Sequence, residues 1–185
     1  CYALTVEPKT PLEKLIRTAQ KETTDPDLQA QHFAILVECL EKAGFLHYEI
    51  SNFGKPGFES RHNRSYWQGS HYSGIGPSAH SYNGVSRQWN VSNNQQYIAA
   101  IESGNIPYEI ETLTSQQQCN EYIMTSLRTI EGLDLNRLGN NQQTVLQAAA
   151  PFLKNETIQQ INNRLVLTKK GKFLADGIAA ALFID

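Results

Sequence analysis

The chain is poor in the residues and segments that most directly reveal a function. Its 185 residues include three cysteines and one methionine, and it starts on Cys1 rather than on methionine. Cys1, Cys39 and Cys119 are odd in number and far apart, which fits neither a disulfide scaffold nor a metal-binding spacing. We therefore expect a protein of the reducing cytoplasm.

An excess of charge and long apolar runs are also lacking. The net charge of −2 gives no general attraction to nucleic acid or to an anionic membrane. No apolar run is long enough for a transmembrane helix, and no signal peptide is visible at the start. Hydrophobic residues still make up 40% of the chain, so it can bury the core of one large or two small domains.

The first fifty residues indicate alternating strands and helices. Residues 2–7 read as a strand without a lead-in, so we expect the sequence to begin inside a domain, as the C-terminal piece of a longer protein. Helix-capping signals follow at Thr10 and Asp25, each with a proline next to it. Cys39 falls on the apolar stripe of the second helix and is predicted to be a core thiol. A strand at 45–50 completes the order typical of a parallel βαβ sheet.

Residues 51–92 contain many loop-forming residues, and further elements follow them up to residue 112. Short strands are predicted at 69–75 and 86–90, a helix at 94–102, and a linker or edge strand at 107–112.

All five histidines lie before residue 113, where the composition changes. A capping box at 114–117 predicts a helix to about residue 130. Further helices are predicted at 133–138, around 145–153 and after Thr168, with a hairpin formed by 157–161 and 164–167. Helices followed by a hairpin are typical of a winged-helix domain. The candidate core residues are Leu133, Phe152 and Phe173, with Leu165 and Leu167 on the buried face of the hairpin.

Three motifs stand close together before residue 80, in the order Tyr48-Glu-Ile-Ser-Asn-Phe53, His62-Asn-x-x-Tyr-Trp67 and Gly74-Ile-Gly-Pro-x-Ala79. Leu167-Thr-x-x-Gly171 follows near the C-terminus. Together they resemble the oxygen-independent coproporphyrinogen-III-oxidase-like proteins of the radical SAM superfamily, in their heme-chaperone branch, and the resemblance covers residues 1–185. It implies an α/β fold: a partial (β/α) barrel remnant with a loop and strand extension at 1–112, and a helical winged-helix-like domain at 113–185.

The resemblance also implies a heme site in the second motif. His62 would offer an imidazole to heme iron, with Asn63, Tyr66 and Trp67 beside it. Arginines in and near the motif would pair with propionates, namely Arg61, Arg64 and Arg87. The alternative from the residues alone stays open: His62 and Asn63 hydrogen-bond a loop while the two aromatic side chains fill the core.

The glycine motif does not fit a dinucleotide fingerprint, because Pro77 follows the second glycine and no amphipathic helix continues from it. By resemblance, Gly74, Gly76 and Ala79 would line the cofactor cavity, while a tight corner between strands is an equally open interpretation.

Other side chains give weaker hypotheses. A zinc site formed by His62, His71 and His80 is disfavoured, because their spacing matches no known ligand set. Glu49 and Glu59 are predicted to pair with Arg61 or Arg64 rather than to act as general acids or bases.

We assign no catalytic residue to the chain. The Cys-x-x-x-Cys-x-x-Cys motif of the family is absent, so the ligands of a [4Fe–4S] cluster and of S-adenosylmethionine would lie outside this chain, in the N-terminal half of the parent. The parent would bind heme and deliver it to a receiving protein, and a homodimer is left open. The alternatives are an anaerobic coproporphyrinogen III oxidase and a winged-helix nucleic-acid-binding module. Seven Lys/Arg against six Asp/Glu after residue 112 oppose the latter, so no nucleic-acid partner is expected.

Overall fold

The computed structural model describes residues 2–184, which fall into two compact units. The first unit ends at Glu59 and the second begins at Ser60. This division differs from the boundary after residue 112 that the change in composition suggests, and that boundary stays a prediction about the domains of the parent. Each unit is described by itself below.

The first unit contains two helices and one small hairpin, α1 (Pro11–Arg17), α2 (Pro26–Lys42), β1 (Leu46–Glu49) and β2 (Asn52–Gly54). Both helices begin where their caps predict. The Thr10 hydroxyl accepts a hydrogen bond from the Glu13 amide at 3.2 Å, and the Asp25 carboxylate accepts from the amides of the first turn of α2.

The parallel βαβ arrangement predicted for this unit is wrong. Residues 2–7 form neither helix nor strand, and β1 pairs antiparallel with β2 instead of with an earlier strand. The turn at Ile50–Ser51 is the physical reason, because the buried Glu49 carboxylate accepts hydrogen bonds from the Ser51 amide and the Asn52 side chain and folds the chain back on itself. In the part of the chain that the structure describes, every pair of named strands is antiparallel.

Cys39 is exposed, so its prediction as a core thiol is also wrong. The cause is that α2 has no buried residue: its apolar stripe has the predicted helical spacing but is only partly covered, for example where the Phe33 ring meets that of His47 on β1 at 5.8 Å.

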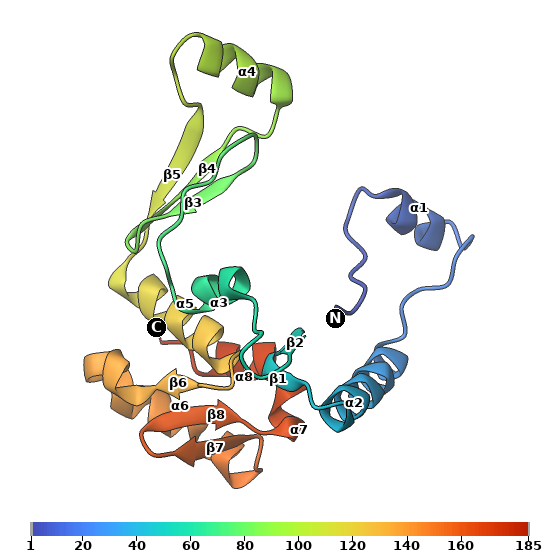
Figure 1. Ribbon diagram of the computed structural model, residues 1–185, viewed down its shortest axis with the longest axis vertical. Coiled ribbons are helices and arrows are strands. Elements are labelled where there is room, and N and C mark those ends of the chain that lie inside the picture. Colours follow the sequence, from blue (N-terminus) through green and yellow to red (C-terminus); the bar gives the residue numbers. More distant parts are fainter. Residues whose placement is uncertain (1, 185) are drawn as a thin grey trace. The chain divides into compact units, whose positions relative to one another are not determined.

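The second unit starts with helix α3 (Arg61–Trp67) and a three-stranded antiparallel sheet. The sheet has the order β3-β4-β5, with β3 at His80–Tyr82, β4 at Ser86–Asn90 and β5 at Tyr108–Thr112. Helix α4 (Asn94–Glu102) connects β4 to β5 (Figure 1). The predicted strand at 69–75 is reduced to a single bridge, Tyr72 with Tyr82, in a segment that starts at Gly69 with a positive φ of 71°.

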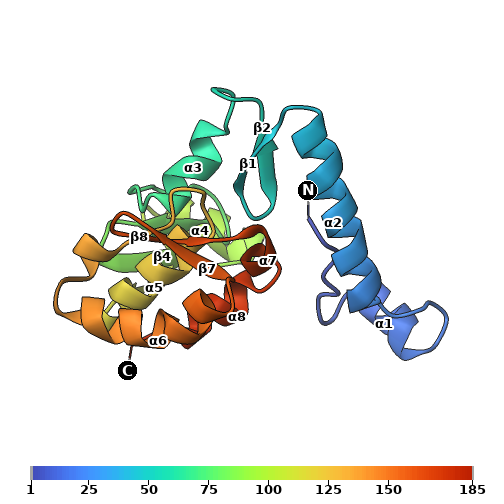
Figure 2. The ribbon, with the colours of Figure 1, turned by 90° about the horizontal axis from the view of Figure 1, so that it is seen from below.

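The rest of the second unit is a set of helices beside a second small sheet of order β6-β8-β7. In Figure 2 the strands β7 and β8 lie on one side and helices α5, α6 and α8 on the other. The capping box of α5 is present, with the Thr114 hydroxyl and the Gln117 side chain each bonded to the other's backbone amide. The elements are α5 (Ser115–Leu127), β6 (Leu133–Asp134), a 3-10 helix η1 (Leu135–Asn141), α6 (Gln142–Lys154), β7 (Ile158–Ile161), β8 (Arg164–Leu167), α7 (Lys169–Lys172) and α8 (Ala175–Ala181).

The hairpin β7–β8 confirms the sequence prediction, including the alternation that buries Leu165 and Leu167 and leaves Arg164 outside. Leu133 is fully buried, as predicted, and Phe152 is half-buried. Phe173 is 46% exposed, so its assignment to the core is wrong. The last helix is broken into α7 and α8, and Phe173 caps the end of α7 instead of facing inward.

Helix α5 holds this unit together from several sides. Ile123 and Leu127 are buried in the core, while Gln116 and Asn120 donate side-chain hydrogen bonds of 2.9 and 3.0 Å to the carbonyl oxygen of Ile184. None of the helices within residues 2–184 combines the length and the apolar character needed to cross a bilayer.

Candidate functional site

Helix α3 carries the His-Asn-x-x-Tyr-Trp motif on a capped turn. The Ser60 hydroxyl accepts a hydrogen bond from the Asn63 amide at 3.2 Å, which fixes the start of the helix. His62 lies on the exposed side and Tyr66 one turn later, with ring centroids 5.0 Å apart and an edge-on geometry. Within residues 2–184 the imidazole nitrogens of His62 have no hydrogen-bond partner, so they are open to a ligand.

Aromatic contacts continue from Tyr66 into the sheet. Its ring lies 4.9 Å from that of Tyr72, which in turn lies 6.1 Å from that of Tyr82 on β3. Trp67 contacts Arg128 instead, whose guanidinium carbon lies 5.3 Å from the centre of the Trp67 ring. The buried Nε1 of Trp67 has no acceptor among the described residues. Since Tyr66 is 40% exposed, the motif does not simply fill a core.

These aromatic residues border a cleft of about 630 Å³ within the second unit. One wall comes from the end of α3 and from β3 and β4, and the other from α5 and η1. Its side chains are mostly aromatic or polar: Tyr66, Trp67, Gln68, Ser70, Tyr72, Tyr82, Arg87, Ser115, Gln118, Cys119, Glu121, Tyr122, Thr125, Arg137, Leu138 and Asn141.

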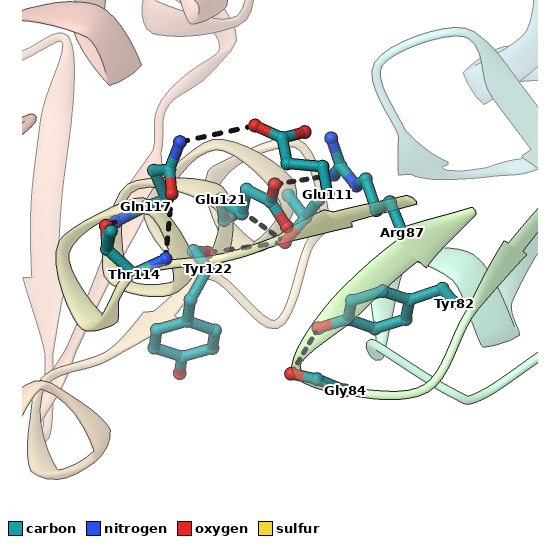
Figure 3. Close-up of polar contacts among 9 residues, drawn as sticks. Tyr82, Gly84, Arg87, Glu111, Thr114, Gln117, Glu121 and Tyr122 are labelled. Carbon is teal, nitrogen blue, oxygen red and sulfur yellow. Dashed lines mark hydrogen bonds and ion pairs between the residues drawn. The ribbon is translucent and has the colours of Figure 1, made fainter. Parts of the chain in front are cut away.

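One ion pair joins the two walls. The Arg87 guanidinium on β4 lies 2.7 Å from the Glu121 carboxylate on α5, with Glu111 beside them on β5 (Figure 3). Burial raises the pKa of the Glu121 carboxyl, although Arg87 lowers it, and Glu111 raises it further. Burial is also the main reason that the pKa of the nearby Tyr72 hydroxyl is raised.

A second arginine borders the cleft without such a pair. The Arg137 guanidinium carbon lies 4.1 Å from the centre of the Tyr122 ring. No carboxylate within residues 2–184 pairs with it.

Among the predicted propionate partners, only Arg87 borders the cleft. Arg64 instead forms an ion pair with Glu131, and Arg61 is exposed on the first turn of α3. Pairing of Glu49 or Glu59 with these arginines stays a prediction, since the two glutamates belong to the first unit. The Glu49 carboxylate is held inside the β1–β2 turn, and that of Glu59 accepts from the Gly57 amide at 3.3 Å.

The glycine motif forms a tight corner. A side chain at Gly74 would collide with the backbone of His80, and the Gly76 amide donates to the Tyr97 hydroxyl at 3.2 Å. The Asn90 side chain donates to the Gly76 carbonyl at 2.9 Å, and Ala79 accepts from the Asn90 amide. Gly74 borders a separate pocket of about 710 Å³, between the sheet and α4.

The other two histidines of the disfavoured zinc site, His71 and His80, have surroundings that differ from those of His62. His71 borders this second pocket, and His80 stands beside Trp89 at 6.4 Å. Among residues 2–184, no three His, Cys, Asp or Glu side chains lie close enough together to hold a metal ion.

Sequence reasoning missed the α5 and η1 side of the cleft, namely Glu121, Tyr122 and Arg137. A signal was present in α5, where Gln118, Tyr122 and Thr125 recur at intervals of four and three residues on a polar face away from Ile123. The sequence near α5, however, does not indicate which segments lie across the cleft from that face.

Comparison with known proteins gives a consistent result. The family model described as the HemN C-terminal domain matches residues 113–174. The heme chaperone HemW of Mycobacterium tuberculosis (strain ATCC 25618 / H37Rv) is 35% identical over 182 residues, which cover 98% of this chain and 46% of that protein. HemW of Bacillus subtilis (strain 168) is 31% identical, over 97% of this chain and 49% of its own length.

Among solved structures, coproporphyrinogen III oxidase (HemN) from Escherichia coli, described as a radical SAM enzyme, aligns with a TM-score of 0.66. The match covers 86% of this chain and 42% of the oxidase at 17% identity, which shows a shared fold. The chain spans about half the length of the curated relatives it matches. The resemblance indicated by its motifs, to the oxygen-independent coproporphyrinogen-III-oxidase-like family and its heme-chaperone branch, is thereby confirmed.

Proposed function

We propose that this chain provides the heme-binding surface of a heme chaperone, which holds heme and passes it to a receiving protein. One observation carries the proposal: α3 presents the open imidazole of His62 at the surface, and its neighbour Tyr66 leads directly into an aromatic cleft. The HemW relatives, which carry the name heme chaperone and align along nearly the whole chain, support it.

The residues present fit heme as a ligand. His62 would supply a nitrogen lone pair to the iron, and Tyr66 would offer its half-exposed ring to the flat macrocycle. Asn63 and Trp67 would support the helix turn around them, and the buried, unpaired Trp67 Nε1 is a donor that a bound group can satisfy. When bound, heme would supply an iron centre that accepts the imidazole.

The rest of the parent enters the proposal from the family resemblance. It would comprise the barrel remnant in residues 1–112, the winged-helix-like domain in 113–185, and a further segment that holds the [4Fe–4S] cluster and S-adenosylmethionine in the cytoplasm. The apolar stripe of α2, on which no residue is fully buried, supports packing against such a segment. The loop 74–79 would border the cofactor cavity of the whole protein.

The test is His62→Ala in the full-length protein, followed by heme titration monitored at the Soret band. We expect heme affinity to fall at least about tenfold and the band to shift, because the iron loses its protein ligand. His80→Ala, which removes another exposed histidine of the same unit, is the matched control and should leave both unchanged. An unaltered spectrum and affinity in a folded His62→Ala protein would place the iron ligand elsewhere.

A further inference from the structure

The charged groups of the cleft suggest how it recognises its ligand. We propose that Arg137 and Arg87 bind the carboxylates of a flat, aromatic ligand, and that Glu121 occupies Arg87 until a carboxylate of the ligand replaces it. This inference rests on the proposed function, since it names the side chains that would hold the propionates of heme.

Arg137 differs from two other arginines of the second unit in its partners. Arg128 and Arg164 each pair with an aspartate, at 2.8 and 2.7 Å, but Arg137 has no acidic partner among residues 2–184. Its guanidinium carbon lies 4.1 Å from the centre of the Tyr122 ring, and no carboxylate among residues 2–184 occupies the plane of its N–H donors. A carboxylate approaching in that plane can form two parallel charge-assisted hydrogen bonds.

Arg87 already forms an ion pair with Glu121, and burial disfavours the ionised form of that carboxyl. Its guanidinium lies 2.7 Å from the Glu121 carboxylate across the cleft, and Glu111 is the cross-strand neighbour of Arg87 on β5. Desolvation is the largest influence on the Glu121 carboxyl and raises its pKa despite the arginine beside it. A ligand carboxylate therefore competes for Arg87 with the Glu121 carboxylate, which is partly desolvated in the cleft.

The remaining walls fit the flat part of such a ligand. Tyr66, Tyr72 and Tyr82 follow one another at centroid distances of 4.9 and 6.1 Å and all border the cleft. A volume of about 630 Å³ lies within the range of ordinary cofactor pockets, roughly 300–1,000 Å³. A cleft lined by three tyrosine rings and two arginines matches a macrocycle that carries acidic side chains better than it matches a small free acid.

The experiment compares heme with heme dimethyl ester, whose carboxylates are blocked, in the full-length protein. Arg137→Gln should weaken the binding of heme by about tenfold and leave the binding of the ester unchanged. Glu121→Gln should instead strengthen the binding of heme several-fold, because the competitor of the ligand for Arg87 loses its charge. A merely structural role of either residue predicts a loss for both ligands. Arg164→Gln, in the hairpin, is the matched control.

The outcomes separate the two proposals. If wild-type protein binds heme but Arg137→Gln binds heme and ester as wild type does, the carboxylate assignment is wrong and the chaperone proposal stands. A weaker affinity for heme in a folded Glu121→Gln protein would overturn the exchange at Arg87. If wild-type protein binds neither compound, the proposed function fails and this inference fails with it.

Discussion

Helices α2 and α5 begin in the same way and have different surroundings. Each starts on a side-chain cap that the sequence predicts, Asp25 for α2 and Thr114 for α5. Yet α2, with 17 residues, buries none of them, while α5, with 13, buries Ile123 and Leu127 and borders the cleft on another face. The comparison teaches that caps and periodicity determine where a helix lies in the sequence, whereas burial depends on segments that approach it from elsewhere.

The largest expected effect contrasts one leucine from each region. Leu165→Ala empties a fully buried position beside α5 and should lower the free energy of unfolding by about 3 kcal/mol. Leu28→Ala, on α2 where the side chain is 47% exposed, should cost less than about 1 kcal/mol. Urea denaturation followed by far-UV circular dichroism measures both. Equal losses would mean that the stripe of α2 is covered in solution, and the comparison would not hold.

A pair of glycines sharpens the picture of the buried region. A methyl group on Gly171 would run into the carbonyl oxygen of Thr157, so Gly171→Ala should destabilise the chain by about 2 kcal/mol. Gly177, in helix α8, has open space around it, and Gly177→Ala should stabilise the chain by about 0.5–1 kcal/mol. Thermal melts of the two variants should therefore shift in opposite directions. A fall in both melting temperatures would contradict the open space at Gly177.

Removing the two caps compares the regions more finely. Thr114→Ala and Asp25→Ala each delete side-chain hydrogen bonds worth about 1 kcal/mol to their helix. For α5 the loss should appear in global unfolding, because that helix is part of the core. For α2 it should appear only as faster amide hydrogen exchange in the first turns. Global destabilisation of equal size by Asp25→Ala would show that α2 unfolds together with the rest of its unit.

The smallest effect concerns pH at the polar face of α5. The pKa of Glu121 is raised in the folded chain, so the folded state holds its proton more tightly than the unfolded state does. The resulting stability is present at low pH and is lost as the pH rises from about 4.3, the unfolded value, through the folded pKa. Wild-type protein should therefore lose stability relative to Glu121→Gln over this interval, as urea titrations at several pH values would reveal. A difference between the two that stays constant with pH would contradict the raised pKa.

The sequence predicted what is local and failed where distant segments meet. The caps of α1, α2 and α5 and the β7–β8 hairpin depend on residues a few positions apart, and all four are confirmed. The parallel pairing of a strand at residues 2–7 needed a partner far along the chain, and the Glu49 turn provided a nearer one for β1.

The candidate site shows the same limit. The motif around His62 was found in one continuous segment, although a loop was expected there and the structure has helix α3, whereas the cleft combines side chains from residue 66 to residue 141. No local pattern announces that Arg64 pairs with Glu131, or that Arg87 meets Glu121. The motif therefore indicated the α3 side of the candidate site, whereas the α5 and η1 side could be found only from the folded structure.

The contacts of helix α5 restrict how its sequence can vary in evolution. Ile123 and Leu127 pack in the core, Glu121 borders the cleft, and Asn120 donates to the carbonyl oxygen of Ile184. A substitution at any of these positions disturbs a different function of the same helix, so compensation by a single second change is hard to achieve. Natural variation in α5 should accordingly collect at Met124, whose side chain is 39% exposed.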